Sequence, residues 1–291
     1  MIEYGYLVLA MLSSASLSIM SSLFGRRSGS VRGVSSLYSV VVTASAAAVW
    51  GIASLWKGVF DARVIGYSLL YGLFYAMAMI GMFLAYRHGS ISLTAFVKQL
   101  SLITVALWGF IFWGNKLSVT LAVGLLLIAL ALYLCFRRSR TAMNDGGVSW
   151  QWGLYAAMLL CGNAGCSITQ KYQQLAFGEA SSNGFMLLAT LISFACCFVL
   201  YVKEGRIKPR EVGTSALVFP ILGGISSALL NMLILLLMAS PLSESVIFPG
   251  IAVGGLILTV LFSTLVYRER LSVSKWIGLL VGSVALVFLN I

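Results

Sequence analysis

The sequence predicts an all-α integral membrane protein with ten transmembrane helices arranged as two inverted five-helix repeats. This prediction rests on the composition, the spacing of the apolar segments, and a sequence repeat whose two copies differ in loop charge. Of the 291 residues, 60% are hydrophobic and only 9% are charged, whereas soluble domains carry about 25% charged residues. The composition therefore excludes the soluble globular classes.

Ten apolar stretches are long enough to cross a bilayer, which requires about 20 consecutive mostly apolar residues. The loops between them are too short for a separate soluble domain, so we expect a single membrane domain over residues 1–291. The expected helices cover residues 4–24, 34–56, 64–86, 91–113, 118–136, 152–177, 183–202, 213–238, 244–267 and 271–290.

A short motif occurs twice in the chain. Leu117-Ser118-Val119 opens the fifth apolar segment, and Leu271-Ser272-Val273 opens the tenth, 154 residues later. Each copy ends a block of five segments, which gives repeat one (1–138) and repeat two (150–291), joined by a short basic loop (137–149). A unit with an odd number of spans must insert upside down when it is duplicated, and inverted repeats are typical of secondary transporters.

The basic residues are distributed unevenly between the loops. The loops after the first, third, fifth, seventh and ninth segments hold 13 Lys and Arg, and the other loops hold three. Because cytoplasmic loops collect Lys and Arg, we expect these odd-numbered loops in the cytoplasm and both termini outside a cytoplasmic (inner) membrane. Equivalent loops of the two repeats show an opposite or weaker excess of Lys and Arg, as inversion requires. The net charge of +11 then reflects the orientation of the chain in the membrane, and no nucleic-acid partner is expected.

The C-terminal part of repeat two carries a family resemblance. Gly254-Gly255, the turn Arg268-Glu269-Arg270-Leu271-Ser272, and Trp276-Ile277-Gly278 together resemble the drug/metabolite transporter superfamily. The similarity is to the ten-helix EamA-type permeases and, more distantly, to small multidrug resistance proteins. The resemblance implies that the first four helices of each repeat surround a central substrate cavity. It also implies cytoplasmic termini, which the loop charges contradict, and we follow the charges. Repeat one departs from the motif, with Asn115 in the place of the turn glutamate.

All eight acidic residues lie in loops or at helix ends. Small multidrug resistance proteins rely on a buried glutamate in the first helix, where this chain has Ser13, Ser14, Ser16 and Ser18. Glu244, at the start of the ninth segment, is the weak candidate for coupling transport to an ion. A carboxylate in a first helical turn more often serves the helix terminus.

Lys98, followed by Gln99, is the clearest charge within a predicted helix. It lies about 10 Å below the start of its segment, at a rise of about 1.5 Å per residue. A lysine at such depth usually faces the bundle interior, where it would bind a carboxylate or phosphate of a substrate. The alternatives are that its stem snorkels to the headgroups or that it holds a structural hydrogen bond.

Other polar side chains are candidates for substrate contact. Tyr67, Tyr71 and Tyr75 recur every four residues and therefore share one helix face, where they could line a cavity or simply pack. Asn163 and Asn231 lie deep in their segments. An amide there needs a hydrogen-bond partner, which is either the substrate or a neighbouring helix.

These features predict a secondary active transporter that moves a small metabolite, such as an amino acid or another anion-bearing solute, by alternating access. The alternative is a multidrug or cationic-compound exporter. No P-loop or convergent catalytic set occurs, so we expect neither an enzyme nor a cofactor. The five cysteines lie within predicted helices and suggest packing rather than a metal site. The expected partners are a small-molecule substrate and the lipid bilayer, with a homodimer possible.

Overall fold

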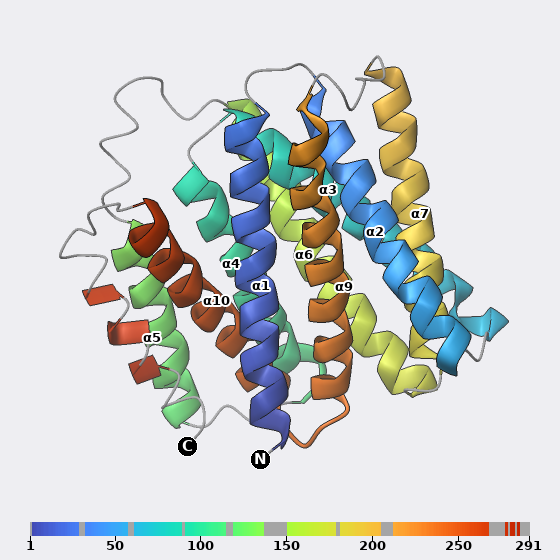
Figure 1. Ribbon diagram of the computed structural model, residues 1–291. Helices are drawn as coiled ribbons and strands as arrows, with labels where there is room; N and C mark the ends of the chain where they lie inside the picture. The colour runs from blue at the N-terminus through green and yellow to red at the C-terminus, as the bar shows by residue number, and fades with distance from the viewer. Residues whose placement is uncertain are drawn as a thin grey trace.

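The computed structural model describes residues 2–28, 33–57, 61–88, 91–114, 119–136, 150–178, 181–204, 212–267, 277–278, 280–282 and 284–285. These residues are almost entirely helical and include no strand (Figure 1). The long helices are α1 (Ile2–Arg27), α2 (Val34–Lys57), α3 (Ile65–His88), α4 (Ile91–Phe112), α5 (Val119–Phe136), α6 (Trp150–Phe177), α7 (Ser182–Lys203), α9 (Val218–Met238) and α10 (Glu244–Tyr267).

The first nine predicted segments each coincide with one of these helices to within a few residues. The tenth segment is described only in part, and its described residues are helical. The basic loop 137–149 and the turn 268–276, which carries the family resemblance, lie outside the described residues.

Five described helices are long and apolar enough to cross a membrane by length and composition. The all-α, membrane-type class predicted from composition is confirmed to that extent. The spans are Ile2–Gly25, Val34–Leu55, Ala62–Ala85, Ser182–Lys203 and Ser215–Met238.

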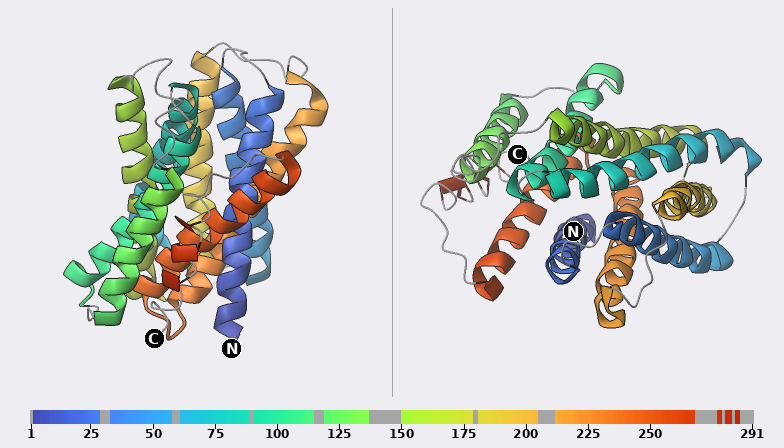
Figure 2. Two further views of the ribbon diagram at one scale, coloured as in Figure 1. Left: turned by 90° about the vertical axis from the view of Figure 1, so that its left-hand side faces the viewer. Right: turned by 90° about the horizontal axis from the view of Figure 1, so that it is seen from above.

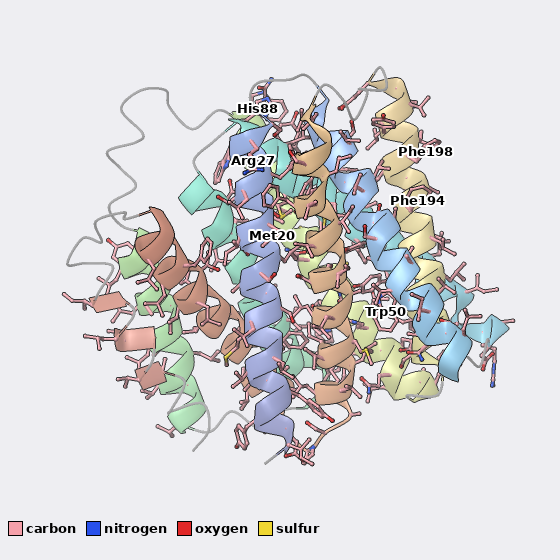
Figure 3. The ribbon with its side chains drawn as sticks, viewed as in Figure 1. Met20, Arg27, Trp50, His88, Phe194 and Phe198 are labelled. Atoms are coloured by element: carbon pink, nitrogen blue, oxygen red, sulfur yellow. The ribbon has the colours of Figure 1, made fainter. Side chains whose placement is uncertain are left out.

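The surface of the bundle is rich in large apolar side chains, as expected for contact with lipid tails. On α7, the rings of Phe194 and Phe198 stack with their centroids 5.8 Å apart, and Phe198 is 44% exposed. Both lie on the outer side of the bundle in Figure 3. Water would be a poor solvent for such a surface, and a bilayer suits it.

Eight of the long helices form a closed ring in which each helix packs against two neighbours. The order around the ring is α3, α6, α4, α10, α1, α9, α2, α7 and back to α3. Helix α5 lies outside the ring, where it contacts α4 and α10 (Figure 2, right). The ring order matters for function because it defines which side chains point into a shared interior.

The packing between α3 and α6 depends on glycine. A Cβ atom on Gly162 of α6 would lie 2.6 Å from the backbone nitrogen of Ala78 and 2.7 Å from the backbone oxygen of Phe74. A Cβ on Gly81 of α3 would meet the backbone of Leu159 at 2.7 Å. Small residues at these positions allow the two backbones to approach closely, as is common between membrane helices.

The turn before α3 is held by Asp61, outside the long helices. Its carboxylate accepts hydrogen bonds from the backbone N–H of Arg63 at 2.9 Å and from the Arg63 guanidinium at 2.9–3.1 Å. These bonds favour the ionised carboxylate and hold the pKa of Asp61 below its usual value. The Arg63 side chain is largely exposed and that of Asp61 is 23% exposed, and the pair orders the turn.

Candidate functional site

Two tyrosines of α3 reach across the ring to α9. Tyr71 Oη donates a hydrogen bond to Asn231 Oδ1 at 2.8 Å, and the hydroxyls of Tyr75 and Ser227 lie 2.7 Å apart. Helices α3 and α9 are not neighbours in the ring, so these bonds cross the interior. Tyr71 and Tyr75 are 1% and 5% exposed, which makes them buried polar groups that need such partners.

Helix α6 joins the same network through its glutamines. Gln170 Nε2 donates to Asn231 Oδ1 at 3.4 Å, and Gln174 Nε2 donates to the backbone oxygen of Leu235 at 3.1 Å. Asn231 Nδ2 in turn donates to the backbone oxygen of Ser227 at 2.8 Å. The Asn231 side chain therefore links α3, α6 and α9.

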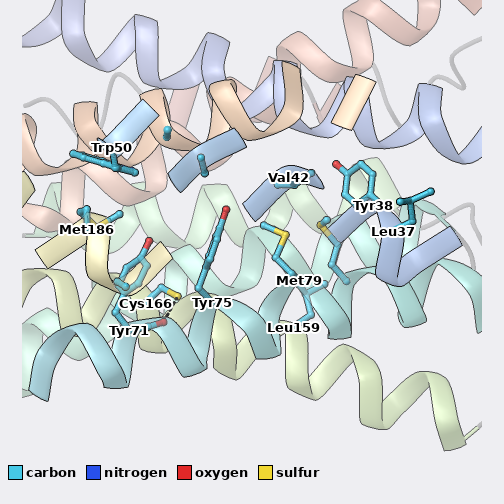
Figure 4. Close-up of a cluster of buried hydrophobic side chains, with 14 of the residues drawn as sticks. Leu37, Tyr38, Val42, Trp50, Tyr71, Tyr75, Met79, Leu159, Cys166 and Met186 are labelled. Carbon is cyan, nitrogen blue, oxygen red and sulfur yellow. Dashed lines mark hydrogen bonds between the residues drawn. The ribbon is translucent and has the colours of Figure 1, made fainter. Parts of the chain in front are cut away.

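The network follows from spacing along each helix. Tyr71 and Tyr75, Ser227 and Asn231, and Gln170 and Gln174 are pairs four residues apart, which places each pair on one helix face, one turn apart. The rings of Tyr71 and Tyr75 stack with their centroids 5.9 Å apart. Both hydroxyls point away from α3 in the same direction (Figure 4).

Lys98 forms a separate bridge across the interior. It is half-buried in α4, and its Nζ donates to Ser18 Oγ of α1 at 3.1 Å. Helix α10 separates α4 from α1 in the ring, so this bond also spans the interior. The partner is a neutral hydroxyl, and no described carboxylate forms an ion pair with Lys98.

Of the remaining predicted residues, Tyr67 and Asn163 are described and do not join these two groups. Tyr67 is half-buried and packs edge-on against Phe177, with ring centroids 5.7 Å apart. Asn163 is half-buried on α6, about two turns before Gln170. Gln99 and Glu244 belong to α4 and to the start of α10, but their side chains lie outside the described residues.

Sequence reasoning missed Gln170, Gln174 and Ser227. A signal for the glutamines was present, because Asn163, Ser167, Gln170 and Gln174 follow a spacing of three and four along the helix, although Thr169, Lys171 and Gln173 nearby are polar too. Such a polar stripe marks one helix face. Ser227 lies one turn before Asn231 and could have been found in the same way.

In the described residues, this interior offers a hydrogen-bond network and, separately from it, the ammonium group of Lys98. The described residues contain no group of three His, Cys, Asp or Glu side chains that could hold a metal ion. Tyrosine hydroxyls, amides and serines can exchange partners with a bound solute without a change in protonation. The Lys98 ammonium adds a positive charge that a solute could neutralise.

Comparisons with known proteins support the fold alone. No protein-family model and no curated protein matches the sequence. A solved structure described only as "Crystal structure of protein" is similar over 97% of this chain and 94% of its own, with a TM-score of 0.71 and 16% identity. Nearly the whole chain therefore adopts a fold seen in a solved structure.

Tyr71→Phe is expected to lower the melting temperature, because it removes the hydrogen bond to Asn231. The lost bond should contribute about 0.6 kcal/mol, as is typical between membrane helices. A double-mutant cycle with Asn231→Leu, followed by thermal unfolding in detergent, would measure the coupling. Tyr67→Phe is the matched control and should leave the melting temperature unchanged. Additive effects of Tyr71→Phe and Asn231→Leu would contradict the bridge.

Proposed function

We propose that the protein is a ten-helix secondary active transporter of the drug/metabolite transporter superfamily, resembling the EamA-type permeases. Its two five-helix halves are inverted, and it moves a small anion-bearing solute across the cytoplasmic membrane by alternating access. The observation that carries this proposal is the amino group of Lys98, which lies inside the ring with a neutral partner, Ser18.

The order of helices in the ring supports the inversion. In the proposed halves, α1, α2, α3 and α4 are equivalent to α6, α7, α9 and α10, and the 154-residue offset places α3 on α9 and α4 on α10. Exchanging the halves turns the α3–α6 contact into α9–α1, α3–α7 into α9–α2, and α4–α6 into α10–α1. The α2–α7 and α4–α10 contacts map onto themselves. The exchange therefore reproduces the ring, as an internal two-fold axis would.

The unpaired charge supports an anionic substrate. A lysine within a membrane protein is unfavourable unless it faces a partner or water, and the Ser18 hydroxyl supplies no negative charge. A substrate carboxylate or phosphate would form a charge-assisted hydrogen bond with Nζ, and such bonds are about twice as strong as neutral ones. Binding of the substrate would then offset the free-energy cost of removing the charged lysine from water.

The alternative of a multidrug or cationic-compound exporter has less support. A cation would be drawn to aromatic faces, and the stacked pair Tyr71 and Tyr75 provides such faces. The described interior nevertheless holds a cation and no carboxylate, which disfavours a positively charged substrate. The stacked faces are also buried against each other and against Phe185.

A binding screen with the purified protein tests the proposal. Small carboxylates, amino acids, organic phosphates and cationic dyes would be compared by thermal shift, and the stabilising compounds followed by uptake into proteoliposomes. We expect stabilisation and uptake for anion-bearing solutes. Uptake of the cationic dyes without any anion would support the multidrug alternative instead.

The ends of the described helices support the proposed topology. Arg27 and His88 lie at the same end of the bundle, where α1 and α3 finish (Figure 3), and Lys203 ends α7. We propose that this end faces the cytoplasm, because cytoplasmic ends collect basic residues. A C-terminal alkaline phosphatase fusion should then be active, while a fusion within loop 137–149 should be inactive. The reverse pattern would place the termini inside.

A further inference from the structure

Aromatic side chains of three helices meet near the end of the bundle where Arg27 and His88 lie. The ring of Tyr38, near the start of α2, has its centroid 5.3 Å from that of Phe24 on α1 and 5.2 Å from that of Phe83 on α3. Phe24 and Tyr38 are fully buried. In the ring of helices, α9 lies between α1 and α2, and α7 lies between α2 and α3. These aromatic contacts therefore cross the interior.

The hydroxyl of Tyr38 fixes this side chain to α1, where it is hydrogen-bonded to Ser21 Oγ. Ser21 Oγ itself donates to the Leu17 carbonyl at 2.8 Å, so Tyr38 is the donor in the bond between the two hydroxyls. Helix α9 is close as well, because a Cβ atom on Gly223 would lie 3.4 Å from Tyr38 Oη. Tyr38 therefore lies among α1, α3 and α9.

The contacts of Tyr38 lie between Lys98 and this end of the bundle. On α1, Ser18 accepts the hydrogen bond from Lys98, Ser21 follows about one turn later, and Phe24 about one turn beyond that. At a rise of about 1.5 Å per residue, Ser21 and Phe24 are about 4.5 and 9 Å nearer to the end than Ser18. A solute that moves along α1 from this end towards Lys98 meets Phe24 and Tyr38 first.

The tyrosine network of α3 and α9 lies on the other side of Lys98. The hydroxyls of Ser16 and Ser226 are 2.9 Å apart, which fixes the level of α9 relative to α1. Asn231 is five residues further along α9, or about 7 Å farther from the Arg27 end. Its partner Tyr71 lies at the opposite end of the buried row in Figure 4 from Tyr38. Lys98 and Ser18 are therefore flanked by crossing contacts on both sides.

We propose that Tyr38 is the gate between Lys98 and the end of the bundle that carries Arg27. Its ring fills the interior between α1 and α3, and its bond to Ser21 holds it in the closed position. The closure does not depend on which solute is bound, whereas its role in alternating access rests on the proposed function. Tyr38 has to move before a solute can pass between Lys98 and this end.

Cysteine accessibility tests the gate. A Ser18→Cys reporter places a thiol beside Lys98, and Arg27→Cys marks the membrane face at which this end lies, because Arg27 is exposed. Each reporter protein is treated with the membrane-impermeant thiol reagent MTSES in right-side-out and in inverted vesicles. Peptide mass spectrometry then scores the label at the reporter position alone, apart from the native cysteines. Arg27→Cys should react rapidly from one face, and Ser18→Cys slowly from that same face.

Variants of Tyr38, each combined with Ser18→Cys, assign the slow reaction to the gate. Tyr38→Ala removes the ring and should speed labelling at least tenfold from the face that Arg27→Cys marks, with no change from the other face. Tyr38→Phe keeps the ring but loses the donor, and the loss of one hydrogen bond should speed labelling about threefold. Phe198→Ala is the matched control, because it removes a ring on the outer side of α7. It should leave the rates from both faces unchanged.

The outcomes separate the gate from the proposed function. Unchanged labelling in both Tyr38 variants overturns the gate, and so does an equal acceleration from the two faces, which would show a general loosening of the bundle. If Tyr38→Ala does not fold, Tyr38→Phe decides. Acceleration from the marked face alone supports the gate even if no anion is bound or taken up, a result that would overturn only the anion transporter.

Discussion

Gly162→Ala is expected to lower the melting temperature by about 6–12 °C. The new Cβ would lie 2.6–2.8 Å from three backbone atoms of α3, which cannot move aside as a flexible side chain can. Overpacking of this kind costs about 3 kcal/mol, and a domain of this size loses about 2–4 °C per kcal/mol. Because α3–α6 is one link of the ring, the strain should reach the tyrosine network on α3. Thermal unfolding followed by size-exclusion chromatography measures the loss.

Gly153→Ala is the matched control on the same helix. A Cβ at Gly153 meets nothing within 4 Å, and alanine is the better helix former. Its melting temperature should equal or exceed that of the unmodified protein. A Gly162→Ala protein that unfolds within about 2 °C of the unmodified protein would show that α3 and α6 lie farther apart than described.

Lys98→Met is expected to abolish transport of anion-bearing solutes while making the protein more stable. Loss of a charge-assisted hydrogen bond of about 2 kcal/mol corresponds to about 30-fold weaker substrate binding. The same change removes a desolvated charge, so the melting temperature should rise. Ser18 keeps a partner, because its Oγ also donates to the Ser14 carbonyl at 3.1 Å. Uptake into proteoliposomes and thermal unfolding measure the two effects.

Two further variants sharpen this test. Lys203→Met removes an exposed lysine at the end of α7 and should leave both uptake and stability unchanged. Lys98→Arg keeps the charge and should retain part of the uptake. Full uptake by Lys98→Met would show that the lysine holds a structural role only, and the substrate would then need a different anchor.

The helices themselves could be predicted from the sequence with good accuracy. Apolar runs of about 20 residues leave little choice of structure, because every backbone polar group in a bilayer must be paired within a helix. Residues 34–56 and 91–113 were expected as helices, and α2 and α4 occupy Val34–Lys57 and Ile91–Phe112.

The candidate site could be predicted only where polarity contrasts with an apolar background. Tyr71, Tyr75, Asn231 and Lys98 stand out in this way, and the structure places all four as bridges across the ring. Tyr38 does not stand out, because aromatic residues are common in apolar segments and its contacts depend on which helices surround it.

The tyrosine stripe shows why helix faces are only approximate in sequence. Residues four apart on a 3.6-residue turn drift by about 40° at each step. Tyr71 and Tyr75 therefore face the interior, while Tyr67, at the end of the row, packs against Phe177 instead. Which part of a row is buried depends on where the neighbouring helix ends, and that is a property of the fold.

The closed order of the eight helices also has a consequence for the route of the solute. Many oily compounds reach a transporter sideways, from the bilayer, through a gap between two helices. Here each helix of the ring packs against both of its neighbours in the described part of the chain, so a side entrance would require two packed helices to separate. For the proposed transporter, this packing favours a solute that arrives in water at the ends of the bundle over one dissolved in the membrane.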